Sequence, residues 1–117
     1  MPDLESLLDQ VDEMREEIIT LEQDLVRIPT VNTGFMPTGN ETEACRYIEK
    51  WLAEDGIESE TIESAPDRGN LIARLEGGSG KAGLMFMSHL DVVPVEEEEK
   101  WRFPPFSATV ADGRVFG

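Results

Sequence analysis

Basic residues are scarce in this sequence of 117 residues: 10 Lys and Arg stand against 25 Asp and Glu, giving a formal net charge of −15. Such an acidic surface repels phosphate groups, so we expect no nucleic acid and no anionic membrane among its partners. The acids fit a solvated acidic surface. They also fit a protein from a cell with a salty interior, which the ratio of seven Arg to three Lys mildly supports.

Cysteine and long apolar runs are also rare. Cys45 is the single cysteine, which excludes an internal disulfide and indicates a reducing compartment. We expect it to be a small buried residue of a helix. The first thirty residues carry acids throughout, so they resemble neither a signal peptide nor a transmembrane helix. A cytoplasmic protein is therefore expected.

An apolar stripe at alternating spacings of three and four predicts one amphipathic helix over residues 3–28, ended by Pro29. The stripe consists of Leu4, Leu7, Val11, Met14, Ile18, Leu21, Leu25 and Ile28. It is typical of a helix packed on a sheet, and it also fits a coiled coil.

A loop containing Pro and Gly is predicted at 29–40. Asn40 or Thr42 is then a candidate cap for a second helix, which runs to Asp55 and stops at Gly56. The apolar face of this helix is expected to comprise Ala44, Cys45, Ile48, Trp51 and Leu52.

Three strand candidates follow, at residues 57–62, 70–75 and 84–88. The third, LMFMS, is apolar on both faces, which is the pattern of a central strand covered on each side. Met85 and Met87 are accordingly expected in the core.

Two hairpin turns are predicted. Residues 77–83 contain GGSGK but lack the first Gly and the Ser or Thr of a phosphate-binding loop, which favours a simple turn. Near the end of the chain, 107–110 alternates, an Asp-Gly turn follows, and 115–116 begins the return strand. The elements together predict an α/β fold with two helices and the strands of a mixed sheet.

His89-Leu90-Asp91 lies just past the third strand candidate, where open α/β sheets place their ligands. In an extended chain this spacing puts both side chains on one side. His89 can then offer one ring nitrogen to a metal, while Asp91 either holds the other ring N–H or lies behind the ligand and orients the site. Alone, the motif is common, and a structural histidine is the simpler interpretation.

His89 and Asp91 belong to a longer ordered set of motifs: SHLDVVPV, then Trp101, then PPFSATVADGRVFG. Upstream, the chain reads LVRIPTVN, GNETEACRYIEKWLAEDGIESETIES and NLIARLEG. Over residues 14–117 this order closely resembles the N-terminal part of the M20 metallopeptidase family. The nearest subgroups are the aminoacylase/carboxypeptidase-S-like and acetylornithine deacetylase/succinyl-diaminopimelate desuccinylase-like enzymes.

The resemblance implies that residues 1–117 are the N-terminal segment of a zinc-exopeptidase-like catalytic domain. The rest of that domain and a dimerisation domain would lie outside this truncated sequence, with a homodimer among the full-length forms. It implies a site for two Zn²⁺, or alternatively Co²⁺, that hydrolyses the amide of a small N-acyl amino acid or peptide. His89 would be a metal ligand, and Asp91 the catalytic acid that fixes the orientation and basicity of this ligand.

The remaining ligands and the general-base glutamate are expected beyond Gly117, so the chain alone is expected to be inactive. The alternative is a non-catalytic chain that associates through the helix 3–28. Glu17 and Glu22, which flank the stripe, would repel each other across a homodimer interface.

Other notable residues have simpler interpretations. Trp101 and Phe103 are expected to pack a loop, with substrate contact as the alternative. Arg68 could reach a substrate carboxylate, but Asp67-Arg68-Gly69 is more simply a turn. The four glutamates at 96–99 are typical of a solvated loop.

Overall fold

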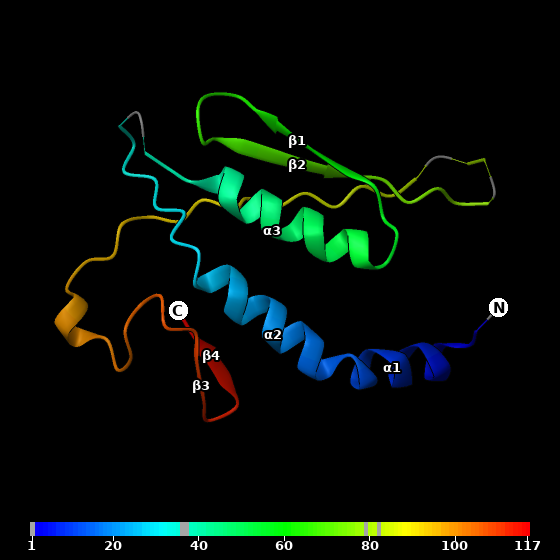
Figure 1. Ribbon diagram of the computed structural model, residues 1–117. Coiled ribbons are helices and arrows are strands. Elements are labelled where there is room, and N and C mark those ends of the chain that lie inside the picture. Colours follow the sequence, from blue (N-terminus) through cyan, green and yellow to red (C-terminus); the bar gives the residue numbers. More distant parts are fainter. Residues whose placement is uncertain (1, 36–37, 79, 82) are drawn as a thin grey trace. The chain divides into compact units, whose positions relative to one another are not determined.

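The computed structural model describes residues 2–35, 38–78, 80–81 and 83–117. The chain forms two compact units: Met1–Ile28 with Val95–Gly117, and Pro29–Pro94. Helices occur together with two small sheets, in line with the predicted α/β class (Figure 1). Within the described residues, no helix combines the length and apolar character that a membrane span requires.

The first unit begins with α1 (Leu4–Glu13) and α2 (Arg15–Val26) rather than with the single predicted helix. The interruption is at Met14, whose ψ of 0° departs from helical geometry. The Met14 N–H still donates to the Gln10 carbonyl at 3.1 Å, and the Ile18 N–H donates to the Met14 carbonyl at 2.9 Å. The prediction of one uninterrupted helix is wrong at this residue, although helical hydrogen bonds continue on both sides of it.

The apolar stripe of α1 is open to solvent. Its side chains are between 44% and 72% exposed at Leu4, Leu7 and Val11. This exposure does not match a stripe packed on a sheet, whereas the coiled coil, which requires a second chain, stays a prediction.

The predicted C-terminal hairpin of the first unit is confirmed as β3 (Thr109–Ala111) and β4 (Arg114–Phe116). Asp112 and Gly113 form the turn with φ of 51° and 71°, the left-handed pair that a two-residue hairpin prefers. The Phe103 ring meets the Phe116 ring edge-on at 5.0 Å between centroids. The packing role predicted for Phe103 is therefore observed.

In the second unit, α3 (Glu41–Glu54) confirms the second predicted helix, with Asn40 as its N-cap residue and a left-handed Gly56 just past its C-terminal end. Ala44 and Cys45 are buried. The helix packs on a hairpin of β1 (Ser59–Glu63) and β2 (Gly69–Ala73), which run antiparallel (Figure 1). Its polar side chains also bond to β1, and Thr42 Oγ1 donates to Glu63 Oε1 at 2.7 Å.

The predicted central strand at 84–88 is not formed within the described residues. Leu84, Met85, Phe86 and Met87 are between 77% and 89% exposed, so the expectation that Met85 and Met87 are core residues is wrong here. Instead of pairing, residues 85–91 and β2 line an open groove of about 720 Å³. The apolar pattern predicts which faces of a strand are buried. It does not predict which neighbouring strand would provide the backbone hydrogen bonds.

The predicted mixed sheet is consequently absent from the described part of the chain: both sheets are antiparallel and two-stranded, and parallel pairing is limited to the bridge between Val31 and Val92. The predicted turn at 77–83 falls partly on Ser79 and Ala82, which lie outside the described residues, as do Met36 and Pro37 of the predicted loop 29–40.

Candidate functional site

The backbone on either side of Asp91 is held by the loop that begins the second unit. The Asn32 N–H donates to the Val92 carbonyl at 2.8 Å, and the Val92 N–H donates to the Thr30 carbonyl at 3.0 Å. Thr30 Oγ1 also donates to the Leu90 carbonyl at 2.6 Å. The position of the Asp91 backbone therefore depends on a segment about sixty residues earlier in the chain.

His89 contacts Asp91 through one ring nitrogen. Its Nδ1 lies 2.8 Å from the Asp91 carbonyl oxygen and 3.3 Å from Asp91 Oδ1. A carbonyl oxygen can only accept, so Nδ1 carries the proton in this contact. In the neutral ring, Nε2 then keeps its lone pair, and with a side chain 83% exposed it is accessible to a ligand.

The Asp91 carboxylate is held from the opposite side. Asn32 Nδ2 donates to Asp91 Oδ2 at 2.8 Å, and Arg68 Nη2 lies 3.7 Å from the same oxygen. The hydrogen bond from Asn32 is the main cause that lowers the pKa of Asp91 below its ordinary value, and the charges of His89 and Arg68 act in the same direction. Asp91 is therefore a carboxylate at neutral pH.

Arg68 is part of a buried ion pair. Its Nη2 lies 2.8 Å from Glu41 Oε1, and its Nη1 donates to the Thr38 carbonyl at 3.2 Å. The Arg68 N–H donates to the Ala65 carbonyl at 2.9 Å, so a turn forms over residues 65–68. It overlaps the predicted turn at 67–69, but Gly69 already begins β2. The Arg68 guanidinium contacts carboxylates of the protein itself, and the alternative that it binds a substrate carboxylate stays a prediction.

The structure thus brings together His89 and Asp91, whose roles as metal ligand and catalytic acid remain predictions. Sequence analysis did not single out Asn32 or Glu41. Asn32 carries no signal beyond its place in the PTVN motif. Glu41 is an acid in the first turn of α3, where acids are common because the helix dipole favours them, so its pairing with Arg68 was not evident.

The donors near His89 fit part of a metal site. In the described ranges of the chain, no group of three or more His, Cys, Asp or Glu side chains is placed to hold a metal ion. Zinc in proteins normally has three or four protein ligands. His89 fits the role of one such ligand because its Nε2 is exposed while Nδ1 is held by Asp91.

A sequence model of Peptidase family M20/M25/M40 matches residues 85–117, which contain His89 and Asp91. The N-formyl-4-amino-5-aminomethyl-2-methylpyrimidine deformylase of Halalkalibacterium halodurans is 34% identical over 116 residues, 97% of this chain. The succinyl-diaminopimelate desuccinylase of Parvibaculum lavamentivorans is 41% identical over 98 residues, 80% of this chain. The chain belongs to peptidase family M20/M25/M40.

This M20 chain spans about a quarter of the length of the curated relatives that it matches, 26% and 23% for the two above. A probable succinyl-diaminopimelate desuccinylase of Staphylococcus epidermidis is 35% identical over 102 residues, which are 87% of this chain and 23% of the relative. The family resemblance inferred from the motifs is therefore confirmed.

Proposed function

We propose that this chain is part of a metal-dependent hydrolase that cleaves the amide bond of an N-acyl amino acid or short peptide. Residues 1–117 would form the N-terminal segment of its zinc-exopeptidase-like catalytic domain. The observation that carries the proposal is the contact of His89 Nδ1 with Asp91, because it leaves Nε2 exposed for a metal within the stretch that matches the M20 family.

The names of the relatives support an N-acyl substrate. One is a deformylase of an N-formyl compound, and another is a desuccinylase of succinyl-diaminopimelate. Both names describe the removal of an acyl group. We extend this bond type, and not the particular acyl group, to the protein that contains this chain.

Bound Zn²⁺ or Co²⁺ would supply Lewis acidity for the amide carbonyl and lower the pKa of a water at the site. His89 would hold one ion through Nε2, while Asp91 accepts the Nδ1–H, which fixes the ring plane and raises the basicity of Nε2. The other ligands and the general base would come from outside residues 1–117. The chain alone is accordingly expected to bind zinc weakly and to be inactive.

The test uses the full-length protein encoded by the reading frame that contains this chain. We expect it to release amines from N-formyl, N-acetyl or N-succinyl amino acids, to lose activity on chelation, and to regain it with Zn²⁺ or Co²⁺. His89→Ala should remove one metal and nearly abolish hydrolysis. Full activity of the metal-free protein would refute the proposal.

A second candidate is a non-catalytic role in which two copies of the chain associate through α1 and α2. The exposed stripe residues Leu4, Leu7 and Val11 favour this association, and the flanking acids oppose it. Sedimentation of the chain with and without Leu7→Glu distinguishes the candidates, because only a dimer formed through this stripe would be dissociated by the change.

A further inference from the structure

The two oxygens of the Asp91 carboxylate have separate partners. Oδ1 faces the His89 ring, with Nδ1 at 3.3 Å. Oδ2 accepts from Asn32 Nδ2 at 2.8 Å and lies 3.7 Å from Arg68 Nη2. A carboxylate engaged on both sides cannot rotate about its Cβ–Cγ bond without losing one of these contacts. The orientation of Asp91 is therefore determined by Asn32 and Arg68 as well as by His89.

The amide of Asn32 is itself held in one orientation. Its Oδ1 accepts the Gly34 N–H at 2.8 Å, while its Nδ2 donates to Asp91. An amide turned by 180° would place Oδ1 against Asp91 Oδ2, where two acceptors face each other, and would lose the bond from Gly34. The Gly34 N–H therefore determines that a donor, and not an acceptor, faces Asp91.

Arg68 is held from behind by Glu41 and by the Thr38 carbonyl, at 2.8 and 3.2 Å. The Glu41 side chain is only 7% exposed and that of Arg68 is 24% exposed. A Cβ added to Gly39 would lie 2.6 Å from Glu41 Oε2 and 2.8 Å from Arg68 Nε. The absence of a side chain at Gly39 thus makes room for the ion pair of Arg68 with the buried Glu41, and Arg68 in turn lies 3.7 Å from Asp91.

We propose that Asn32 and Arg68 are positioning residues, which fix the Asp91 carboxylate at 3.3 Å from His89 Nδ1. There it adds a second acceptor to the Asp91 carbonyl oxygen at 2.8 Å, and so favours the Nδ1–H tautomer with Nε2 free. The importance of this arrangement for catalysis rests on the proposed function, but the tautomer can be measured without any activity. A neutral imidazole carries one ring proton, and the partner of one nitrogen decides which nitrogen carries it. If the carboxylate turns away, the Asp91 carbonyl alone favours Nδ1–H, so the share of the Nε2–H tautomer, which blocks metal binding at Nε2, rises.

His89 is the only histidine of the chain, so long-range ¹H–¹⁵N correlation spectra of the labelled 117-residue chain report its tautomer directly. Spectra recorded at about pH 8.5 are two units above the ordinary histidine pKa. Asn32→Asp keeps an oxygen for Gly34 but places an acceptor against Asp91. We expect Nδ1–H to predominate in the wild type and its share to fall in Asn32→Asp. Gln10→Glu, the same change of amide to acid at an exposed position of α1, should keep the wild-type tautomer.

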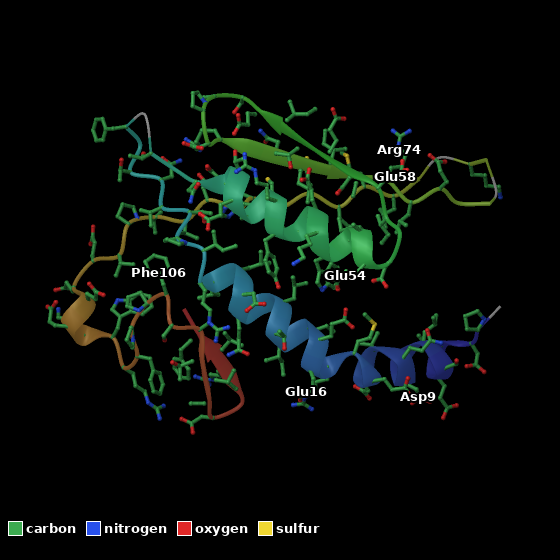
Figure 2. All side chains as sticks on the ribbon, in the orientation of Figure 1. Asp9, Glu16, Glu54, Glu58, Arg74 and Phe106 are labelled. Atoms are coloured by element: carbon green, nitrogen blue, oxygen red, sulfur yellow. The ribbon has the colours of Figure 1, made fainter. Side chains whose placement is uncertain are left out.

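Arg68 requires a double variant, because Arg68→Gln alone would leave Glu41 buried without a partner. Glu41→Gln/Arg68→Gln removes both charges together. Arg74→Gln is the matched control: this arginine follows β2, its side chain is 84% exposed, and it projects away from the hairpin (Figure 2). We expect the Nδ1–H share to fall in the double variant only. An Nε2–H tautomer in the wild type, or no change in either test variant, would overturn the proposal.

The same variants of the full-length protein test the catalytic consequence. Partners behind a metal ligand typically contribute about 10- to 100-fold in metal affinity or activity. We expect a fall of this size in zinc affinity and kcat with a smaller change in KM, and no change in the two controls. Zinc affinity at the wild-type level in Asn32→Asp would overturn the positioning role. A wild-type protein that hydrolyses no N-acyl compound would instead refute the proposed function, and the tautomer spectra would still decide the positioning roles.

Discussion

Gly69 of β2 lies directly against Thr42 of α3: a Cβ added to Gly69 would be 2.9 Å from the Thr42 Cα and 2.9 Å from its Oγ1. Real Cβ atoms do not approach backbone atoms this closely. The residue at position 69 therefore sets how near α3 can lie to the hairpin. Because Arg68 and Glu41 immediately precede these two residues, the same contact sets the geometry of the ion pair behind Asp91.

Gly69→Ala should consequently destabilise the chain. Overpacking of this kind typically costs about 1–3 kcal/mol, and we expect a lower urea midpoint of unfolding. Gly77→Ala is the control, because a Cβ there meets no atom within 4 Å and the backbone is not left-handed. It should change the free energy of unfolding by less than about 0.5 kcal/mol. Equal midpoints for the two variants would show that α3 can move away from β2 without loss.

The elements that the sequence predicts well are those defined by local residues. Asn40 and Gly56 bound α3, and Asp112-Gly113 forms the turn between β3 and β4. The absence of a strand at residues 84–88 was not predictable in this way, because an apolar strand pattern does not identify the strand with which it would pair. The break at Met14 was not predictable either, because the apolar spacing continues unchanged through this residue.

The contacts of the candidate site also differ in whether local sequence predicts them. His89 and Asp91 are two residues apart, so their contact follows from the local motif. Asn32 is 59 residues away from Asp91 along the chain, and its contact depends on the path of the loop before α3. The pairing of Arg68 with Glu41 likewise depends on the packing of α3 against the hairpin. Such contacts are set by the tertiary structure, which no local pattern encodes.

Ala108 is fully buried and has a left-handed φ of 50°, a conformation that disfavours any residue with a Cβ. Its carbonyl accepts from Gln23 Nε2 at 2.8 Å, which links it to α2. We expect Ala108→Gly to relieve strain and to stabilise the chain by up to about 1 kcal/mol. Ala44→Gly, within α3, should instead destabilise by about 1 kcal/mol. Thermal unfolding that shows the same sign for both changes would contradict the strain at Ala108.

Burial raises the pKa of the Cys45 thiol, a hydrogen bond with Thr61 partly offsets this, and the charges of Glu49 and Glu41 add to the rise. The folded state therefore holds the thiol proton more tightly than the unfolded state. This contribution to stability is fully present below the unfolded pKa and is lost as the pH rises through the folded pKa. We expect wild-type stability to fall relative to Cys45→Ala above about pH 8.5, measured by urea unfolding. Parallel pH profiles would contradict the shift.

The net charge of −15 should make stability depend on salt. Repulsion among the acids is screened over about 10 Å at 0.1 M salt and about 3 Å at 1 M, so we expect the Tm to rise from low to molar KCl. Asp9 and Glu16 lie on the surface of α1 and α2 (Figure 2). Asp9→Asn/Glu16→Gln should therefore reduce the dependence on KCl. A Tm that is flat or falls with KCl would remove the argument for a salt-rich origin.

Asp91→Asn is the most direct test of the His-x-Asp motif in the full-length protein. The change keeps the shape of the side chain but removes the charge that raises the basicity of His89, so metal should still bind with reduced affinity. We expect a large fall in kcat and a smaller change in KM, because the lost interaction matters most in the transition state. Asp112→Asn removes the same charge at an exposed position paired with Arg102 and should leave both constants unchanged. The test is steady-state kinetics on N-acyl amino acids, with metal content measured alongside. A near-normal kcat with both metals bound would show that Asp91 is a structural residue and not a catalytic one.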